Sequence, residues 1–270
     1  MNDYPVRVRI DYPQRSSRGW AILTIFWIKA LALIPHGIVL IVLGVGAAIV
    51  FVIAQIAVVA RGVFPPGLFE FLTGYVRWYT RVKAFFFSLT DRYPPFSLQG
   101  DAAYPVDVEV DYPERSSKLL AALSLALVVV GIIGFAYFIN WAIDQIPSDT
   151  TPDTGSWYYN LFSWSSNSGE NPLGAFRIIL LIPHVIIVAV LGIAAFIVWF
   201  IVQWVILFVA RFPEGMHKFV AQWTGWGVRI AAYSNGLTDR YPPFTLETVE
   251  SGPSAGVAPS QPPPVPPPPP

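Results

Sequence analysis

Long apolar runs constrain this chain more than any other feature of its sequence. Residues 20–60, 119–143 and 174–210 are almost entirely apolar, and about 20 consecutive apolar residues are enough for a helix to cross the hydrocarbon core of a bilayer. Only 13% of the 270 residues are charged, against roughly 25% in soluble domains. The sequence therefore excludes an ordinary soluble domain and predicts an α-helical integral membrane protein in contact with the lipid bilayer.

Composition also excludes several kinds of site. The 17 basic residues are balanced by 17 acidic residues, so no positive field indicates nucleic-acid binding. Cysteine is absent and histidine occurs three times, which provides no thiolate ligand and no histidine cluster for a metal ion. The chain lacks the Walker, HExxH, GxSxG and GxGxxG patterns of common catalytic and cofactor sites. We therefore expect no metal, no cofactor and no catalytic residue.

The chain contains two copies of one unit. Two motifs recur 100 residues later, namely YPV at 4–6 and 104–106, and DYPQRSS at 11–17, which returns as DYPERSS at 111–117. Three motifs recur 148 residues later, namely LIPH at 33–36 and 181–184, FPPG at 64–67 with FPEG at 212–215, and LTDRYPPF at 89–96 and 237–244. We predict repeat units over 1–100 and 101–249, with 48 additional residues inside the second unit. A proline-rich tail, 250–270, is expected to be disordered.

The paired DYPxRSS, LIPH, FPxG and TDRYPPF motifs resemble the bacterial membrane family built from the domain of unknown function 4389, present here as two tandem copies. The resemblance covers nearly all of residues 4–247, and TDRYPPF is its most specific motif. It implies a membrane architecture but no established activity. The insertion in the second unit is the main departure from a simple duplication.

Basic residues predict which side of the membrane each segment faces. No Lys or Arg lies between Lys118 and Arg177, whereas the segments before and after this stretch contain all of them. Cytoplasmic segments carry an excess of Lys and Arg. We therefore expect the loop 144–173 outside, and both termini on the cytoplasmic side of a bacterial inner membrane.

The number of spans follows from keeping both copies of each polar motif on one side. We predict four transmembrane helices in two pseudo-symmetric units, over 19–34, 36–61, 119–143 and 184–209. Corners at Pro35 and Pro183 would precede the second and fourth spans, because proline lacks an amide donor and clashes inside a helix. Residues 19–34 cover only about 24 Å of a core of roughly 30 Å. A helix lying in the membrane plane over 19–34 is the alternative.

Amphipathic periodicity follows each return span. Residues 68–89 and, more weakly, 216–237 have polar side chains along one helical face. This spacing is typical of interfacial helices. We expect both helices to lie on the cytoplasmic leaflet, with basic side chains towards the lipid phosphates.

Alternation with period two predicts strands at the start of each unit. Residues 6–10 read VRVRI and residues 106–110 read VDVEV. The polar positions are basic in the first copy and acidic in the second, so we expect a small cytoplasmic β-sheet with charge pairing between its strands. The alternative is that these charges are solvated on unpaired strands.

Polar side chains at membrane depth are functional candidates, because they are costly there. Six occur as repeat-related pairs: Lys29 and Arg177, His36 and His184, Gln55 and Gln203. One interpretation makes the histidines a proton-responsive or ligand-binding pair. In the alternative, the cations extend to lipid headgroups, the histidines cap backbone at the proline corners, and the glutamines form interhelical hydrogen bonds.

A repeated Asp-Arg-Tyr sequence lies within TDRYPPF. Its members are Asp91, Arg92 and Tyr93, and their copies Asp239, Arg240 and Tyr241. An acid after Thr and next to Arg is more typical of a turn held by hydrogen bonds and an ion pair than of a catalytic group. We therefore interpret this motif as structural, and expect the serines of DYPxRSS to cap helices.

Function is the least constrained expectation. Polar motifs outside the spans and the absence of a charged path through them favour a non-enzymatic scaffold or accessory subunit of a membrane complex, with a membrane-protein partner or a second copy of the chain. The internal duplication and the Lys/His pairs favour a small oligomeric transporter or channel as the alternative. The amphipathic helices alone suggest a lipid-modifying enzyme.

Overall fold

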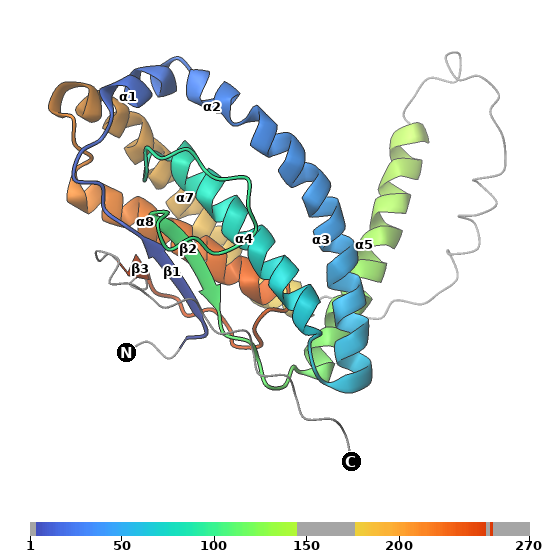
Figure 1. Cartoon of the computed structure of the whole chain (residues 1–270). Coiled ribbons are helices and arrows are strands. Elements are labelled where there is room, and N and C mark those ends of the chain that lie inside the picture. Colours follow the sequence, from blue (N-terminus) through green and yellow to red (C-terminus); the bar gives the residue numbers. More distant parts are fainter. Residues whose placement is uncertain (1–3, 145–175, 247–248, 251–270) are drawn as a thin grey trace.

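Helices dominate the part of the chain that the structure describes. The computed structural model describes residues 4–144, 176–246 and 249–250 (Figure 1). The helices are α1 Arg18–Ile25, α2 Ile28–Ala32, α3 Ile34–Arg61, α4 Pro66–Phe86, α5 Lys118–Asp144, α7 Phe176–Val209 and α8 Glu214–Ser234. The strands are β1 Val6–Ile10, β2 Val106–Val110 and β3 Val249–Glu250. Apart from their terminal residues Asp144 and Glu250, the predicted outer loop and proline-rich tail lie outside the described residues.

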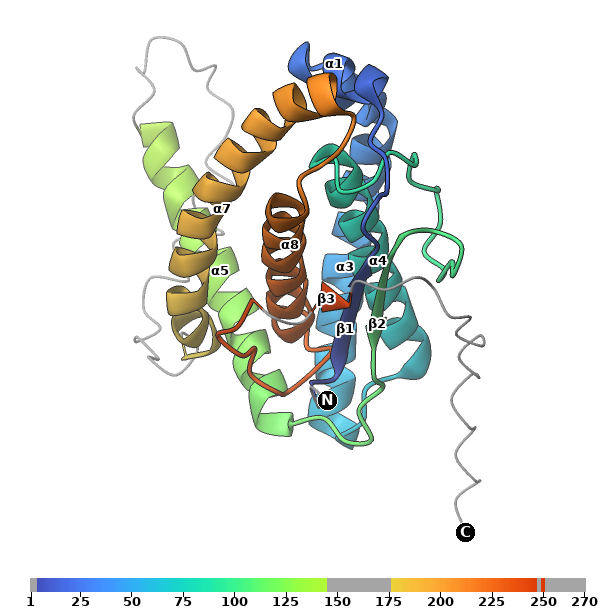
Figure 2. The same ribbon diagram turned by 90° about the vertical axis from the view of Figure 1, so that its left-hand side faces the viewer.

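The described elements form a layered body. The sheet has the order β2-β1-β3, with β1 antiparallel to β2 and parallel to β3. Helix α4 packs against β2 and α3, α8 packs against β1 and α7, and α4 and α8 contact each other. In Figure 1, α4 lies between the sheet and α3. In Figure 2, α8 lies between α7 and the strands. The α4/α8 pair therefore forms the centre of the body.

The predicted sheet is present, with part of its predicted charge pairing. Alternate side chains of β1 are buried, and its arginines face outward opposite the acids of β2, Arg7 to Glu109 and Arg9 to Asp107. Arg7 forms ion pairs with Glu109 at 3.4 Å and with Asp111 at 2.7 Å. Arg9 and Asp107, although opposite each other, do not form an ion pair. Asp107 binds two arginines of α4, and Arg9 binds Asp11.

A single span over 19–34 is not present. The chain makes two short helices there, α1 and α2, separated by Trp27 with a left-handed φ of 60°. The predicted corner at Pro35 is wrong, because Pro35 lies in the first turn of α3, where a missing amide costs nothing. Likewise α7 begins at Phe176 and continues through Pro183 rather than starting after it.

Among the residues that the structure describes, three helices are long and apolar enough to cross a membrane. They are Ile34–Arg61, Lys118–Trp141 and Ile186–Val209. These helices indicate a membrane protein, as the sequence predicts. The fourth predicted span is not confirmed, because α1 and α2 contain only eight and five residues.

The polar face of α4 is covered by protein. Thr73, Thr80 and Arg81 are buried, and Arg77 and Arg81 donate to backbone carbonyls of β2 at 3.0 and 3.2 Å. In α8, Thr224 and Arg229 are buried in the same way. The expectation that these basic side chains turn towards lipid phosphates is therefore wrong. The amphipathic pattern arose because the polar stripe faces the sheet and its flanking loops.

The first helix of each unit packs against the last apolar helix of the other. Helix α1 contacts α7, and α5 contacts α3. The Ser16 amide donates to the Ala210 carbonyl and the Ser116 amide to the Gly62 carbonyl, both at 3.0 Å. These four residues are equivalent in the repeat, so the same bond is made once in each direction.

Candidate functional site

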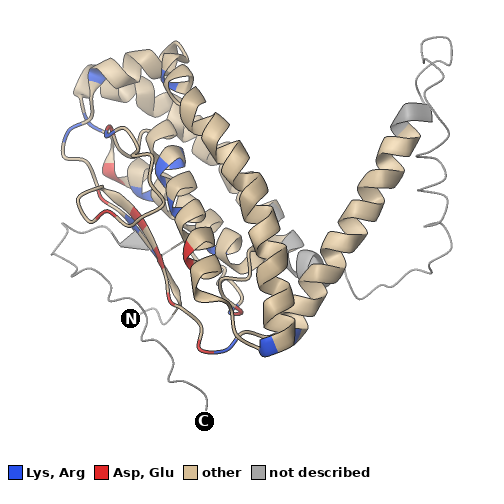
Figure 3. Cartoon of the chain, turned by 45° about the vertical axis from the view of Figure 1, so that its right-hand side comes forward, with Lys and Arg blue, Asp and Glu red and all other residues tan. Residues whose placement is uncertain are grey.

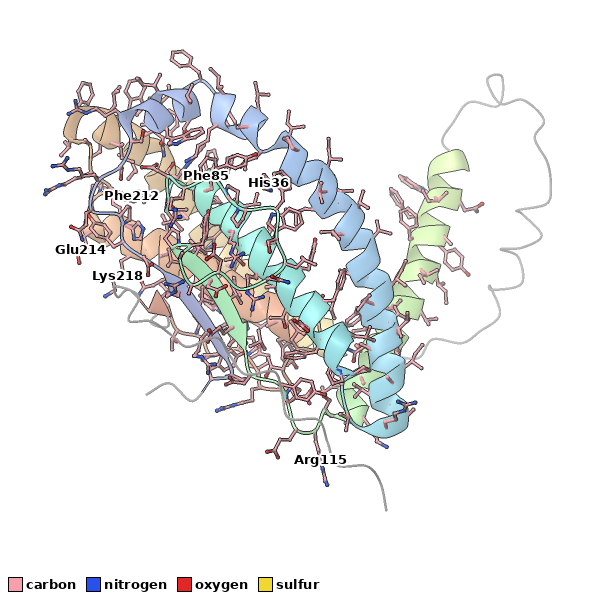
Figure 4. The ribbon with its side chains drawn as sticks, in the orientation of Figure 1. His36, Phe85, Arg115, Phe212, Glu214 and Lys218 are labelled. Carbon is pink, nitrogen blue, oxygen red and sulfur yellow. The ribbon has the colours of Figure 1, made fainter. Side chains whose placement is uncertain are left out.

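Each LIPH histidine lies at a corner formed by three aromatic side chains. His36, between α3 and α4 in Figure 4, is fully buried, accepts a hydrogen bond from the Trp78 indole at 3.1 Å, and stacks on Phe96 at 3.8 Å. Tyr93 lies 5.0 Å away, measured between ring centres. Because Trp78 donates to Nδ1, the neutral ring carries its proton on Nε2, which has no hydrogen-bond partner among the described residues.

The equivalent corner in the second unit holds His184 more tightly. Its Nε2 lies 3.0 Å from the Pro242 carbonyl and its Nδ1 lies 2.9 Å from the Tyr241 hydroxyl. A carbonyl only accepts, so Nε2 carries the proton and Nδ1 accepts from Tyr241. Trp226 and Phe244 complete the corner. The two histidines therefore join LIPH to YPPF within each unit, and neither geometry presents a free basic nitrogen for catalysis.

Lys29 belongs to a buried polar cluster between the units. Its Nζ donates to the Ser88 hydroxyl at 3.0 Å and lies 4.4 Å from the centre of the Phe85 ring. Gln203 of α7 reaches the same hydroxyl at 3.3 Å. Lys29 therefore does not extend to lipid headgroups, and its amine binds Ser88 rather than His36. The side chain of Arg177 lies outside the described residues.

Gln55, near the C-terminal end of α3, bridges the two units. Its Oε1 accepts a hydrogen bond from Ser124 of α5 at 3.2 Å. Its amide nitrogen lies against Gly236, where an added Cβ would approach it to 2.4 Å. Gly236 has a φ of 69°, so a side chain there would be strained as well as blocked. Gln55 and Gln203 thus each bridge two elements from different units.

The repeated aspartates bind the first turn of a distant helix. Asp91 Oδ2 accepts from the Ser17 amide and Asp239 Oδ2 from the Ser117 amide, both at 2.6 Å. Ser17 in turn caps α1 by accepting from the Trp20 amide. Burial raises the pKa of Asp91, while the Ser17 amide and Lys29 act in the opposite direction. A carboxylate near a helix N-terminus is stabilised by the unpaired amides and the helix dipole.

The other members of the motif bind backbone carbonyls. The hydroxyl of Tyr93 donates to Ala32 at 2.8 Å, and the guanidinium of Arg92 donates to Ala103. Tyrosines from YPV close the contact from the other unit, since Tyr104 donates to the Arg92 carbonyl and Tyr4 to the Arg240 carbonyl. The motif is thus held by hydrogen bonds, and in the first copy the Asp91 carboxylate accepts from the Ser17 amide while the Arg92 guanidinium donates to the Ala103 carbonyl.

Two buried arginines were missed by the sequence interpretation. Arg81 donates to Val106 and Gln99 carbonyls and pairs with Asp107 at 3.2 Å. Its repeat equivalent, Arg229, donates to Thr245 at 3.0 Å, and its Nε and one other nitrogen have no partner among the described residues. Burial lowers the pKa of both side chains. The 148-residue offset pairs these two cations in the amphipathic helices, but the sequence interpretation directed the basic side chains of those helices to lipid phosphates and so missed that both are buried.

His217 was also missed. Its Nε2 donates to the Leu89 carbonyl at 3.2 Å, and its ring meets Tyr12 and Phe212 edge-on. Phe69 takes this place in the first unit, between Tyr112 and Phe64. Burial lowers the pKa of His217 to about 4.

These features define a helical membrane protein built from two related units, whose repeated polar residues are used largely to join its own elements. Within the described ranges, no group of three His, Asp or Glu side chains could hold a metal ion. The chain belongs to the family Domain of unknown function (DUF4389), which it matches over residues 24–97 and again over 174–245. Comparisons with curated proteins and with solved structures give no match. The two matched regions agree with the predicted tandem copies.

Proposed function

We propose that the protein is a non-enzymatic scaffold or accessory subunit of a complex in the bacterial cytoplasmic membrane, with its sheet and both termini in the cytoplasm. One observation carries this proposal. The side chains of the repeated motifs bind backbone groups of the chain itself, as Asp91 binds Ser17 and Tyr93 binds Ala32. Groups used in this way position elements and are not available to a substrate.

The two units of this scaffold interlock about a pseudo-two-fold axis. The reciprocal bonds from Ser16 to Ala210 and from Ser116 to Gly62 support this arrangement. So do the tyrosines, since Tyr12 donates to Phe212 and Tyr112 donates to Phe64. Each unit supplies the first helix that completes the other, which gives a single rigid platform rather than two independent domains.

The intramembrane polar groups support a scaffold over a transport path. Lys29 and Gln203 bind the same serine, and Gln55 binds Ser124. A transport path requires polar groups that line a water-filled or substrate-filled channel. These groups instead satisfy one another inside packed contacts between the units.

Affinity purification tests the proposed role. The full chain is tagged, extracted in mild detergent, and the recovered particle is analysed by native mass spectrometry. The scaffold account expects a different protein at constant stoichiometry with this chain.

The opposite outcome is a particle that contains only copies of this chain and mediates flux in liposomes. Variants His36→Phe and His184→Phe provide the matched pair, since each keeps a flat ring in its aromatic corner. Loss of flux in both variants would establish the transporter alternative and contradict the scaffold.

A further inference from the structure

The apolar helices expose one continuous stripe each. Along α3, side chains three or four positions apart are all at least half exposed: Ile38, Ile41, Val45, Ile49, Ile53 and Ile56. Along α7, the corresponding stripe contains Ile186, Val190, Ile193, Ile197, Ile201 and Phe208. No charged side chain interrupts either stripe. Such surfaces are suited to lipid acyl chains and unsuited to water.

Charged residues lie on the side of the body that faces away from α3, level with the middle of that helix. Tyr75 of α4 contacts Gly44 near the middle of α3, and Arg77, two residues further on, binds the Val108 carbonyl of β2. The adjacent charges Arg7, Glu109 and Asp111 are 43 to 52% exposed. An upright α3 would therefore hold exposed charges close to the bilayer centre, where each costs several kcal/mol or more.

Basic side chains also lie at both ends of α3. Arg18 binds the Phe208 carbonyl at the end of α7, which lies at the same end of the body as the beginning of α3. Arg61 and Lys118 lie at the end of α3. Figure 3 shows basic residues, in blue, near both of these ends. An upright α3 would place one basic group on each side of the membrane. Arginine and lysine are concentrated on the cytoplasmic side in membrane proteins, so both ends of α3 belong on the same side.

The directions of the helices lead to the same conclusion. Helix α5 begins where α3 ends, through Ser116 and Gly62, and α7 ends where α1 begins, through Ala210 and Ser16. Figure 2 shows that α7 and α5 both run from the bottom of the view to the top, whereas α3 runs from the top to the bottom, so α7 is antiparallel to α3 and runs in the same sense as α5. Two consecutive spans cannot cross in one direction unless the polar sequence 145–175 crosses between them, which the hydrocarbon core does not allow.

We propose that α3 and α7 lie along the membrane plane, with their exposed stripes in the acyl chains of one leaflet and the β-sheet facing water. The ligand of this surface is the lipid leaflet itself. Both ends of α3 then meet the same headgroup layer, where Arg18, Arg61 and Lys118 face anionic phosphates.

A depth profile along α3 tests this orientation. Because the chain has no cysteine, single spin labels are placed at Ile38→Cys, Val45→Cys, Ile49→Cys and Ile56→Cys in the full chain, reconstituted in lipid vesicles. Collision rates with oxygen and with a water-soluble nickel chelate give the depth of each label. Glu114→Cys, an exposed position of the polar segment before α5, is the aqueous control.

The flat orientation gives similar depths within one leaflet for all four labels. An upright α3 would spread Ile38 and Ile56 over about 27 Å and place the middle labels deepest, which would overturn the proposal. Exposure of all four labels to the nickel chelate as high as that of the Glu114→Cys control would overturn it as well. Only labelled variants whose unfolding temperature in detergent equals that of the wild-type protein are included in the comparison. The result is independent of the scaffold role, which is judged by partner recovery.

Discussion

His217 and Phe69 hold the same place in the two units and differ in one respect that matters for stability. Both rings lie between a tyrosine of DYP and a phenylalanine of the FPxG motif. Only the histidine takes up a proton in the acidic range, and the surrounding apolar groups disfavour the charged form. Phe69 therefore serves as a reference within the same protein for the effect of a buried imidazole on the free energy of unfolding.

Acid should destabilise the protein through His217. Its pKa is about 4 in the folded protein and about 6.5 in the unfolded chain. Because the pKa is lower in the folded protein, the unfolded chain takes up the proton first as the pH falls. The contribution of the neutral His217 ring to the free energy of unfolding is therefore complete above pH 6.5 and is lost as the pH falls towards 4. The loss reaches about 3 kcal/mol.

Thermal unfolding between pH 4 and pH 7 measures this effect. His217→Phe should flatten the pH dependence, and Phe69→His should add a second dependence of the same sign. An unchanged pH profile in His217→Phe would contradict the account.

The two capping aspartates should matter equally. Asp91→Ala removes the acceptor of the Ser17 amide, and Asp239→Ala removes that of Ser117. Each substitution should lower the free energy of unfolding by about 1–2 kcal/mol. Asparagine, which keeps an acceptor oxygen, should recover part of the loss. Denaturant unfolding in detergent measures these differences, and a neutral Asp91→Ala would show that the contact does not stabilise α1.

At the scale of elements, β2 carries two acids of unequal value. Asp107 is largely buried and pairs with Arg77 at 2.9 Å and Arg81 at 3.2 Å. Glu109, two residues along the strand, pairs with Arg7 at the surface, where both side chains are more than two-fifths exposed. Strand periodicity alone makes the two positions look alike.

Removing these acids should separate their roles. Asp107→Ala leaves two guanidinium groups without their carboxylate, so it should cost about 3 kcal/mol. Glu109→Ala should cost less than about 1 kcal/mol, because an exposed ion pair is worth little and Asp111 still binds Arg7. The free energies of unfolding of the two variants give the comparison, and similar values would show that α4 is not anchored through Asp107.

Sequence patterns predicted some elements and misread others for physical reasons. Alternation with complementary charge predicted the pairing of β1 with β2, because register follows side-chain period directly. The polar stripe of 68–89 predicted a helix but not its neighbour, since water, headgroups and a sheet all accept a polar face. No sequence pattern predicted the break at Trp27. Pro35 predicted a corner, but proline is tolerated in the first turn of α3.

The sequence predicted which polar residues form repeat-related pairs in the candidate site, but not which residues they contact. The repeat identified Lys29, His36, Gln55, His184 and Gln203, and all five are buried. Their partners come from distant sequence, as in the contact of Gln203 with Ser88 or of Gln55 with Ser124. No local pattern encodes such contacts, because they join residues that belong to different units.

At the scale of the whole molecule, the duplicated units form one body with unlike sides. The sheet and its ion pairs occupy one side, and α3 and α7, with their exposed stripes, lie beyond α4 and α8, away from the sheet. Hydropathy alone reads these helices as spans because it registers length and composition. The neighbouring charge, which hydropathy does not register, is what makes an upright position costly.

The sidedness of two equivalent arginines shows whether α3 crosses the membrane. Arg15 and Arg115 are exposed and occupy the same place in the two DYPxRSS motifs. Arg15 lies beside the end of α7 and Arg115 beside the end of α3, and these two helices run antiparallel, so the two arginines lie at opposite ends of the body. Arg15→Cys and Arg115→Cys are treated with a membrane-impermeant maleimide in intact cells and in inverted membrane vesicles. The account predicts that both cysteines react only in the inverted vesicles. Reaction of one in cells and of the other in vesicles would show that α3 crosses the membrane and would contradict it.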